Sequence, residues 1–520
     1  MSLTSLQQNW DLVVIGGGIT GAGIFRETVG NNIRTLLVEQ KDFAWGTSSR
    51  SSKMIHGGLR YLKQGKLSLT RQSVKARERM IKDAPGLVVP QEFLLPIFRN
   101  RPPGKRKMGI GLTLYDLFAH KRYHQFLDRG TLCTMEPLLA AHDLVGGFSF
   151  MDTSIDDAGL VLRLINESID AGGEALNYTK AVRINRSADG QVSGVDLKDT
   201  ETGEEITVNT NVVISATGAW SENLSRLPGD GLHLRPLRGS HIIFPFESIP
   251  ITRPVSFFHP EDHRPLFVLP WQGSIMIGTT DLDDDQDLSM EPSISKAEVR
   301  YLITGIASIF PTLKIGSSDA TSSFTGIRPI LSRGRRSASK ESREHMVQAE
   351  KGLVAITGGK LTLFRELALD ALKSAGPYLR PVLKTDKRCG ELPPVFESVS
   401  PQPVRESILP VSIQRRLTGR YGHRAKQLIE EARPEDLTLV PGTTTLWAEL
   451  PHTAKNESVR HLPDLLLRRV RIGLLITEGG KAHLNRIQQL CQPVLPWDDH
   501  RWETEKKDYL NHCRRYYSLP

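Results

Sequence analysis

A strand, a glycine-rich turn and a helix near the start of this chain constrain its fold more than any other feature. Residues 12–15, Leu-Val-Val-Ile, form a short apolar run that is typical of a buried parallel strand. Gly16, Gly18 and Gly21 follow in a G-x-G-x-x-G pattern, with helical periodicity after them. Glycines here let the backbone turn tightly and approach a pyrophosphate, which the helix N-terminus binds through its N–H groups. The segment predicts a Rossmann-like dinucleotide-binding domain.

A carboxylate narrows the choice of nucleotide. The segment "IRTLLVEQ" reads as a second strand, and Glu39 lies at its end. This is the position from which an acidic residue accepts hydrogen bonds from ribose hydroxyls. A carboxylate there disfavours a 2′-phosphate, so NADP is not expected.

Two later segments favour FAD over NAD. "NVVISATGAWS" contains an apolar strand followed by Gly218, and "KGLVAITGGKLTLFRELALDAL" contains another strand followed by Gly358, Gly359 and a helix. A nicotinamide domain needs one glycine turn of this kind. An extended flavin dinucleotide can contact several segments that lie far apart in the sequence. The spread of these turns therefore indicates FAD.

The totals indicate a folded protein of more than one domain. The chain has 520 residues, of which 39% are hydrophobic and 24% charged. The N-terminal residues lack the basic and then apolar pattern of a secretory signal, and no apolar run reaches the length of a membrane helix, so we expect neither. We expect a cytoplasmic protein, or one held at a membrane surface. The scattered cysteines contain no CxxC pair and favour a reducing compartment; they are Cys133, Cys389, Cys491 and Cys513.

The charged segments exclude several functions. The net charge of +9 permits anionic partners, but no nucleic-acid motif or aromatic-rich basic face accompanies it, so no nucleic-acid partner is expected. The acidic run 281–287 lacks the glycine and the closing glutamate of a calcium loop. We expect a solvated acidic loop there and no metal site.

The motifs together resemble those of the FAD-dependent glycerol-3-phosphate dehydrogenase family. They occur in the family's order between about residues 10 and 370, and they are "VVIGGGITGAGI", "TSSRSSKMIHGGLRYL", "DDAGLVL", "ATGAW", "RGSHIIFP", "IGTTD", "TGIRPI" and "GGKLTLFREL". The resemblance implies that glycerol 3-phosphate loses a hydride from C2 to flavin N5, giving dihydroxyacetone phosphate. It implies a membrane quinone as the electron acceptor. An oxidase that passes the electrons to oxygen and gives hydrogen peroxide is the alternative.

The predicted fold class is α/β plus α+β. A discontinuous Rossmann-like FAD-binding domain is expected over residues 9–85, 150–232 and 345–385, with three-layer packing. A mostly antiparallel substrate domain is expected over residues 86–149 and 233–344. Residues 386–520 are expected to form a C-terminal helical domain.

The resemblance assigns residues to the cofactor and to the substrate. The cofactor-binding set is Gly16, Gly18, Gly21, Glu39, Ser48, Ser52, Lys53, Gly57, Gly58, Val182, Gly218, Gly358, Gly359 and Lys360. The substrate-binding set is Arg60, Tyr61, Thr279, Thr280, Arg328 and Lys360. Arginine suits the phosphate because its planar fork can bond two oxygens at once. Strand propensity alone could account for the two threonines.

His56 and Arg328 are the candidate catalytic residues. Imidazole is suited to taking a hydroxyl proton near neutral pH, so His56 is the candidate general base. Its alternative role is to order the FAD loop through hydrogen bonds. Arg328 is a candidate for stabilising the developing oxyanion. His241 is expected to be structural. An alternative outside the enzymes is a scaffold protein that keeps the fold without activity. The presence of all these candidate residues disfavours that alternative.

A basic stretch between Arg99 and Phe126 surrounds an apolar centre. Cations there could bind anionic head groups while apolar side chains enter the membrane interface. The residues expected to enter are Leu112, Leu114, Tyr115, Leu117 and Phe118. The pattern predicts peripheral attachment to the cytoplasmic membrane; the alternative is a solvated basic rim of the substrate domain. A homodimer is compatible with the sequence.

Overall fold

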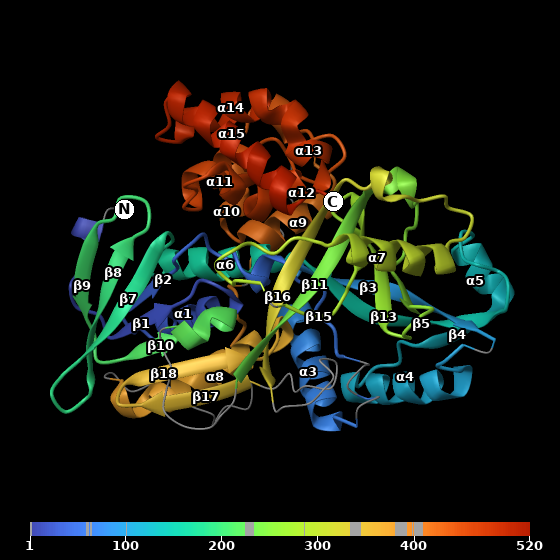
Figure 1. Cartoon of the computed structure of the whole chain (residues 1–520), viewed down its shortest axis with the longest axis horizontal. Helices are drawn as coiled ribbons and strands as arrows, with labels where there is room; N and C mark the ends of the chain where they lie inside the picture. Colours follow the sequence, from blue (N-terminus) through green and yellow to red (C-terminus); the bar gives the residue numbers. More distant parts are fainter. Residues whose placement is uncertain are drawn as a thin grey trace.

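Two large sheets and a group of C-terminal helices make up the molecule (Figure 1). The computed structural model describes residues 3–58, 62, 65–99, 101–223, 233–284, 286–332, 345–379, 393–397, 399 and 409–520. One sheet is mostly parallel and the other mostly antiparallel, and the last stretch of chain is helical. The predicted fold class is confirmed.

The parallel sheet gathers strands from distant parts of the chain. Its order is β17 (His345–Glu350), β18 (Leu353–Gly358), β10 (Val213–Ser215), β1 (Leu12–Ile15), β2 (Thr35–Val38) and β6 (Glu174–Leu176). Only β17 runs antiparallel to its neighbour. The two strands predicted around the glycine turn are confirmed as β1 and β2, which pair side by side.

The two faces of the parallel sheet have different covers. Leu12, Val14 and Leu37 pack beneath the helices α1 (Ile19–Val29), α6 (Asp157–Asp170) and α8 (Phe364–Ala375). Val13 and Ile15 point to the other face and pack against a three-stranded antiparallel sheet. Its strands are β7 (Thr179–Arg186), β8 (Val192–Asp199) and β9 (Glu205–Asn209). The three layers are therefore helices, sheet and sheet.

The second sheet has nine strands and forms the predicted antiparallel region. Its order is β15 (Leu282–Asp283), β11 (His233–Pro245), β14 (Ser274–Gly278), β13 (Pro265–Trp271), β12 (Val255–Phe258), β3 (Val88–Phe98), β5 (Leu144–Ile155) and β4 (Gln125–Asp128), with β16 (Ser322–Ser332) on β11. Only the β12–β3 pair is parallel. Helices α5 (Arg129–Met135) and α7 (Lys296–Ile309) pack on one face.

The C-terminal helices cover the other face of this sheet. They are α9 (Val411–Tyr421), α10 (Arg424–Glu431), α11 (Glu449–Asn456), a π-helical turn η11 (Asp464–Arg469), α12 (Ile472–Leu475), α13 (Thr477–Gly480), α14 (Leu484–Cys491) and α15 (Asp499–Tyr516). Trp502 and Tyr509 of α15 are fully buried in the core that these helices share with the sheet.

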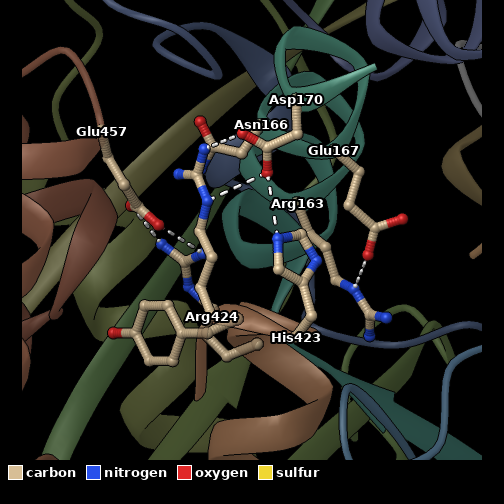
Figure 2. A pocket seen from close by; sticks show the side chains of 9 residues that line it. Arg163, Asn166, Glu167, Asp170, His423, Arg424 and Glu457 are labelled. Atoms are coloured by element: carbon tan, nitrogen blue, oxygen red, sulfur yellow. Dashed lines mark hydrogen bonds and ion pairs between the residues drawn. The ribbon is translucent and has the colours of Figure 1, made fainter. Parts of the chain in front are cut away.

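Ion pairs attach the C-terminal helices to α6, which packs on the parallel sheet. Figure 2 shows the hollow where α9 and α10 meet α6, with Asp170 facing both His423 and Arg424. The Arg424 Nε donates to Asp170 Oδ2 at 3.0 Å. Arg163 Nε donates to Glu167 within α6 at 2.8 Å, and its Nη1 reaches the carbonyl of Gly419 at 2.7 Å. The Arg424–Asp170 pair and the Arg163–Gly419 hydrogen bond therefore join the C-terminal helices to α6.

Helices α3 (Leu67–Asp83) and α4 (Lys105–Ala119) form a separate pair at the lower edge of the view in Figure 1. The expectation that Leu112 and Tyr115 enter a membrane is wrong, because both are buried, at 0% and 1% exposure. Leu117 and Ile110 are exposed, at 62% and 66%. The apolar surface that α4 exposes is thus smaller than predicted. Among the described residues, no helix is long and apolar enough to cross a membrane.

Candidate active site

The turn between β1 and α1 has room only for glycine. Gly16 has a φ of +113°, and a Cβ there would lie 2.6 Å from the carbonyl oxygen of Ala216. A Cβ at Gly21 would lie 1.8 Å from the carbonyl oxygen of Gly16. The strand ends of β1 and β10 therefore approach each other closely here, as a backbone cradle for a pyrophosphate requires.

Polar groups around this cradle fit a dinucleotide. Ser48, in the 3-10 turn η2 (Thr47–Ser49), accepts the N–H of Ile19 at the start of α1 at 2.9 Å. Glu39 accepts the N–H groups of Gly17 and Lys41 at 2.8 and 2.9 Å. Burial raises the pKa of Glu39. The donors of the α1 N-terminus and the carboxylate at the end of β2 are thus where a pyrophosphate and a ribose need them.

We expect Gly16→Ala to abolish tight FAD binding. The new methyl group meets the Ala216 carbonyl, and alanine is strained at this positive φ. The ratio of flavin to protein absorbance after purification measures the loss. Gly203→Ala is the matched control, because Gly203 also has a positive φ, +78°, but nothing lies within 4 Å of the added Cβ. Full FAD content in the Gly16 variant would contradict the assignment of this turn to pyrophosphate binding.

The loop after η2 is held by a buried ion pair. Lys53 is fully buried, and its Nζ lies 2.9 Å from both oxygens of Asp157 at the start of α6. Burial lowers the pKa of Lys53 to about 8. Ser51 also donates to Asp157, at 2.7 Å. Because the side chain of Lys53 is bonded to Asp157, its contact with a cofactor would come from its backbone.

The same loop reaches the nine-stranded sheet and helix α4. Ser52 Oγ lies 3.0 Å from Nε2 of His241, whose ring stacks on Phe324. Burial and the positive charge of Arg328 hold the pKa of His241 well below its usual value, so its ring is neutral. Gly57 donates its N–H to the hydroxyl of Tyr115.

The remaining loop residues are only partly placed. Gly58 has a φ of +81°, and His56 beside this glycine pair is half-buried. Arg60 and Tyr61, predicted to contact the phosphate, lie outside the described residues.

Arg328 lies on β16 beside the ends of β14 and β15. Its Nη2 donates to Thr279 Oγ1 at 2.9 Å, and its Nη1 donates to Asp281 Oδ1 at 2.9 Å. Thr280 is turned inward: it donates to Glu298 at 2.7 Å and accepts the N–H of Ser240 at 2.8 Å. Arg328 thus contacts the side-chain hydroxyl of Thr279, whereas its contact with Thr280 is a longer one, 3.5 Å, to the backbone carbonyl.

Three further segments hold the other predicted cofactor residues. Gly358 and Gly359 have φ values of +80° and +85° at the end of β18, and Gly218 has +58° after β10. Lys360 follows the glycine pair and donates to Ser73 of α3. A β-bulge between Ala181 and Arg183 takes Val182 out of the register of β7 and β8. Its backbone is therefore not committed to the regular ladder, as a contact with a nucleotide would require.

The sequence interpretation missed two acids that hold functional side chains. Asp157 pairs with Lys53, as described above. Asp281 is 5% exposed and forms ion pairs with both Arg264 and Arg328, and Asp284 is 6% exposed. The expectation of a solvated acidic loop is wrong for these two residues. Both acids lie within motifs of the family resemblance, Asp157 in "DDAGLVL" and Asp281 in "IGTTD".

Comparison with known proteins identifies the family. The family model described as "FAD dependent oxidoreductase" matches residues 11–362, and the one described as "C-terminal domain of alpha-glycerophosphate oxidase" matches residues 395–502. An aerobic glycerol-3-phosphate dehydrogenase of Staphylococcus haemolyticus is 32% identical over 94% of this chain and 90% of its own length. The chain belongs to the FAD-dependent glycerol-3-phosphate dehydrogenase family. The predicted family and the predicted FAD cofactor are confirmed.

Solved structures agree with this assignment. The glycerol-3-phosphate dehydrogenase of Bacillus halodurans complexed with FAD is 26% identical, with a TM-score of 0.73 over 98% of this chain and 94% of that one. The L-alpha-glycerophosphate oxidase of Mycoplasma pneumoniae with FAD bound has a TM-score of 0.57 and 17% identity over 71% of this chain and 95% of that one. The second likeness concerns the fold alone.

Proposed function

We propose that this protein oxidises glycerol 3-phosphate to dihydroxyacetone phosphate and passes the electrons to a membrane quinone. One observation carries the proposal: β16 brings Arg328 to the loop at the cofactor cradle. A Cβ at Gly326 would lie 2.6 Å from the carbonyl oxygen of Arg50, so the strand passes directly against that loop. The guanidinium of Arg328, the hydroxyl of Thr279 and the loop bearing His56 thus border one region.

Each of these groups has a proposed task. Bound FAD supplies an acceptor for the hydride that leaves C2 of the substrate. His56 takes the proton of the C2 hydroxyl, for which imidazole has a suitable pKa. Arg328, oriented by Asp281, stabilises the charge that develops on that oxygen. Lys360 and Thr279 bind the substrate, with Arg60 and Tyr61 on its phosphate.

An anaerobic reduction experiment tests this function. Glycerol 3-phosphate added without oxygen should bleach the flavin absorption band of the purified holoenzyme. Glycerol and inorganic phosphate together are the control, because they supply both parts of the substrate without the ester. Unchanged flavin absorbance after addition of glycerol 3-phosphate would refute the proposal.

The electron acceptor is tested on the reduced protein. A soluble quinone should reoxidise the flavin much faster than dissolved oxygen does. Hydrogen peroxide formed at the same rate as dihydroxyacetone phosphate would instead favour the oxidase. The likeness to the α-glycerophosphate oxidase in the C-terminal segment is the observation that keeps this second function in view.

A quinone acceptor requires access to a membrane, and α4 carries the features for it. Ile110 and Leu117 are exposed apolar residues on this helix, and Lys105, Arg106 and Lys107 are exposed at its start. Basic residues next to exposed apolar ones favour an anionic lipid surface. We therefore propose peripheral attachment to the cytoplasmic membrane through α4.

Replacing all three of Lys105, Arg106 and Lys107 by glutamate should abolish flotation with anionic vesicles. The change reverses three charges at the proposed contact, and each basic residue near such a surface contributes about 1 kcal/mol. The measurement is co-flotation with phosphatidylserine-containing liposomes at low and high salt. The same triple change at the exposed residues Lys426, Arg433 and Lys481 is the control. Undiminished flotation of the α4 variant would show that this helix is not the attachment site.

A further inference from the structure

A buried tyrosine hydroxyl lies directly behind the loop that bears His56. Tyr115, on the inner face of α4, is 1% exposed. The N–H of Gly57 donates to its hydroxyl oxygen at 2.6 Å, and the hydroxyl donates to Asp152 Oδ2 at 3.0 Å. The tyrosine thus joins the peptide between His56 and Gly57 to an acid in the middle of β5.

The acid is itself fixed, so the hydroxyl has a defined orientation. Arg77 of α3 donates from Nη1 to Asp152 Oδ1 at 3.3 Å and to the carbonyl of Met151 at 3.1 Å. Its guanidinium carbon lies 4.9 Å from the centre of the Tyr115 ring. Burial raises the pKa of Asp152 to about 6, which leaves it ionised at neutral pH. The carboxylate therefore accepts the hydrogen bond of the Tyr115 O–H, and a lone pair of the hydroxyl oxygen faces the N–H of Gly57.

The packing leaves the loop little room to move. A Cβ at Gly57 would lie 2.5 Å from the Tyr115 hydroxyl and 2.5 Å from Cγ2 of Val74. Val74, Tyr115 and Ala119 form a small apolar cluster, against which Leu62 packs from the far end of the same loop. Neighbouring Ser73 of α3 accepts a hydrogen bond from Lys360. Helices α3 and α4 thus contact two of the segments assigned to the reaction.

We propose that Tyr115 is a positioning residue for the oxidation of glycerol 3-phosphate. By accepting the Gly57 N–H, it fixes the peptide that places His56 at the substrate hydroxyl. The role rests on the function proposed above. Tyr115 transfers no proton to substrate; it acts through the loop.

Tyr115→Phe tests the role, because it keeps the ring and removes only the hydroxyl. In anaerobic stopped-flow reduction, the limiting rate of flavin bleaching should fall about 10- to 100-fold, the loss expected from a small misplacement of a reacting group. The dissociation constant for glycerol 3-phosphate and the FAD content should change less than about threefold, since the buried Tyr115 hydroxyl is bonded to Gly57 and Asp152. Tyr123→Phe is the matched control: Tyr123 packs on the same apolar cluster, but its hydroxyl lies 3.5 Å from Glu78 and not at Gly57.

Hydrogen–deuterium exchange of the holoenzyme gives a second measurement that needs no substrate. The Gly57 amide should exchange at least tenfold faster in Tyr115→Phe than in the wild type and the Tyr123 variant. A wild-type bleaching rate in Tyr115→Phe would overturn the proposal, whatever the exchange shows. If glycerol 3-phosphate fails to bleach the wild-type protein, the proposed function fails. Unchanged Gly57 exchange would then also exclude Tyr115 as the group that holds the loop.

Discussion

Arg328→Ala should lose turnover with glycerol 3-phosphate by about 10²- to 10³-fold while keeping its FAD, the effect typical of removing a fixed donor to a developing oxyanion. The guanidinium is held by Thr279 and Asp281, so it is oriented before substrate arrives. It lies on β16, whereas the glycines of the cradle lie in the turn after β1 and in the first part of α1. Steady-state kinetics with a quinone analogue and the flavin spectrum of the purified variant measure the two quantities.

Arg264→Ala is the control for this prediction. Arg264 also pairs with Asp281, at 2.7 Å, and has the same side-chain exposure of 24% as Arg328. Its loss removes a neighbouring charge but leaves Arg328 bonded to the acid. We expect the Arg264 variant to retain activity within about tenfold. Equal losses in the two variants, or loss of FAD from the Arg328 variant, would assign Arg328 to structure instead of substrate.

The parts of the fold that sequence predicts are those in which local pattern and burial agree. The strand at Leu12–Ile15 is fully buried on both faces, so its apolar run needs no tertiary information to be recognised. The glycine turn after it is partly local: Gly21 is required by the carbonyl of Gly16 in the same strand–turn–helix unit, whereas Gly16 is required by Ala216, far along the chain. The cofactor prediction therefore rests on the strand before this glycine turn and the helix after it.

The parts that sequence missed depend on contacts across large separations. Asp157 is bonded to Lys53 from another segment of the chain, and Asp281 is bonded to Arg328 across two strands. Neither separation produces a sequence pattern. Tyr115 was assigned to a membrane because a basic helix with apolar residues shows the same composition whichever face is buried. Only the packing of α4 on Val74 and Gly57 distinguishes its two faces.

The C-terminal helices contribute to the cofactor loop as well as to the core. Arg468 and Arg469 both pair with Asp42, which follows β2. Tyr517 donates to Glu291, the same carboxylate that pairs with Arg50 of the loop. Arg471 reaches Asp157 at 2.7 Å, so this acid joins Lys53 to the C-terminal region. The loop that borders the cradle is therefore held by charges from outside the cofactor domain.

Asp157→Asn should destabilise the holoenzyme by roughly 3–5 kcal/mol, the usual cost of removing one partner from a buried ion pair. Asp157 and the side chain of Lys53 are both fully buried, and the amide leaves the Lys53 ammonium without its carboxylate. Burial raises the pKa of Asp157, but the charges of Lys53 and Arg471 more than offset this and hold it below its usual value, so the native acid is ionised. Urea titration followed by the rise in flavin fluorescence on FAD release measures the loss.

Two further variants separate a buried charge effect from a general defect in α6. Asp170→Asn, on the same helix, removes a pair with Arg424 that is about one-third exposed at the acid, and should cost less than about 1 kcal/mol. Lys53→Met combined with Asp157→Asn should recover part of the stability of the single variant, because no unpaired ammonium remains, while Arg471 keeps Asp156 at 2.7 Å. If the double variant releases FAD at a lower urea concentration than Asp157→Asn alone, the ion pair is not what holds the loop.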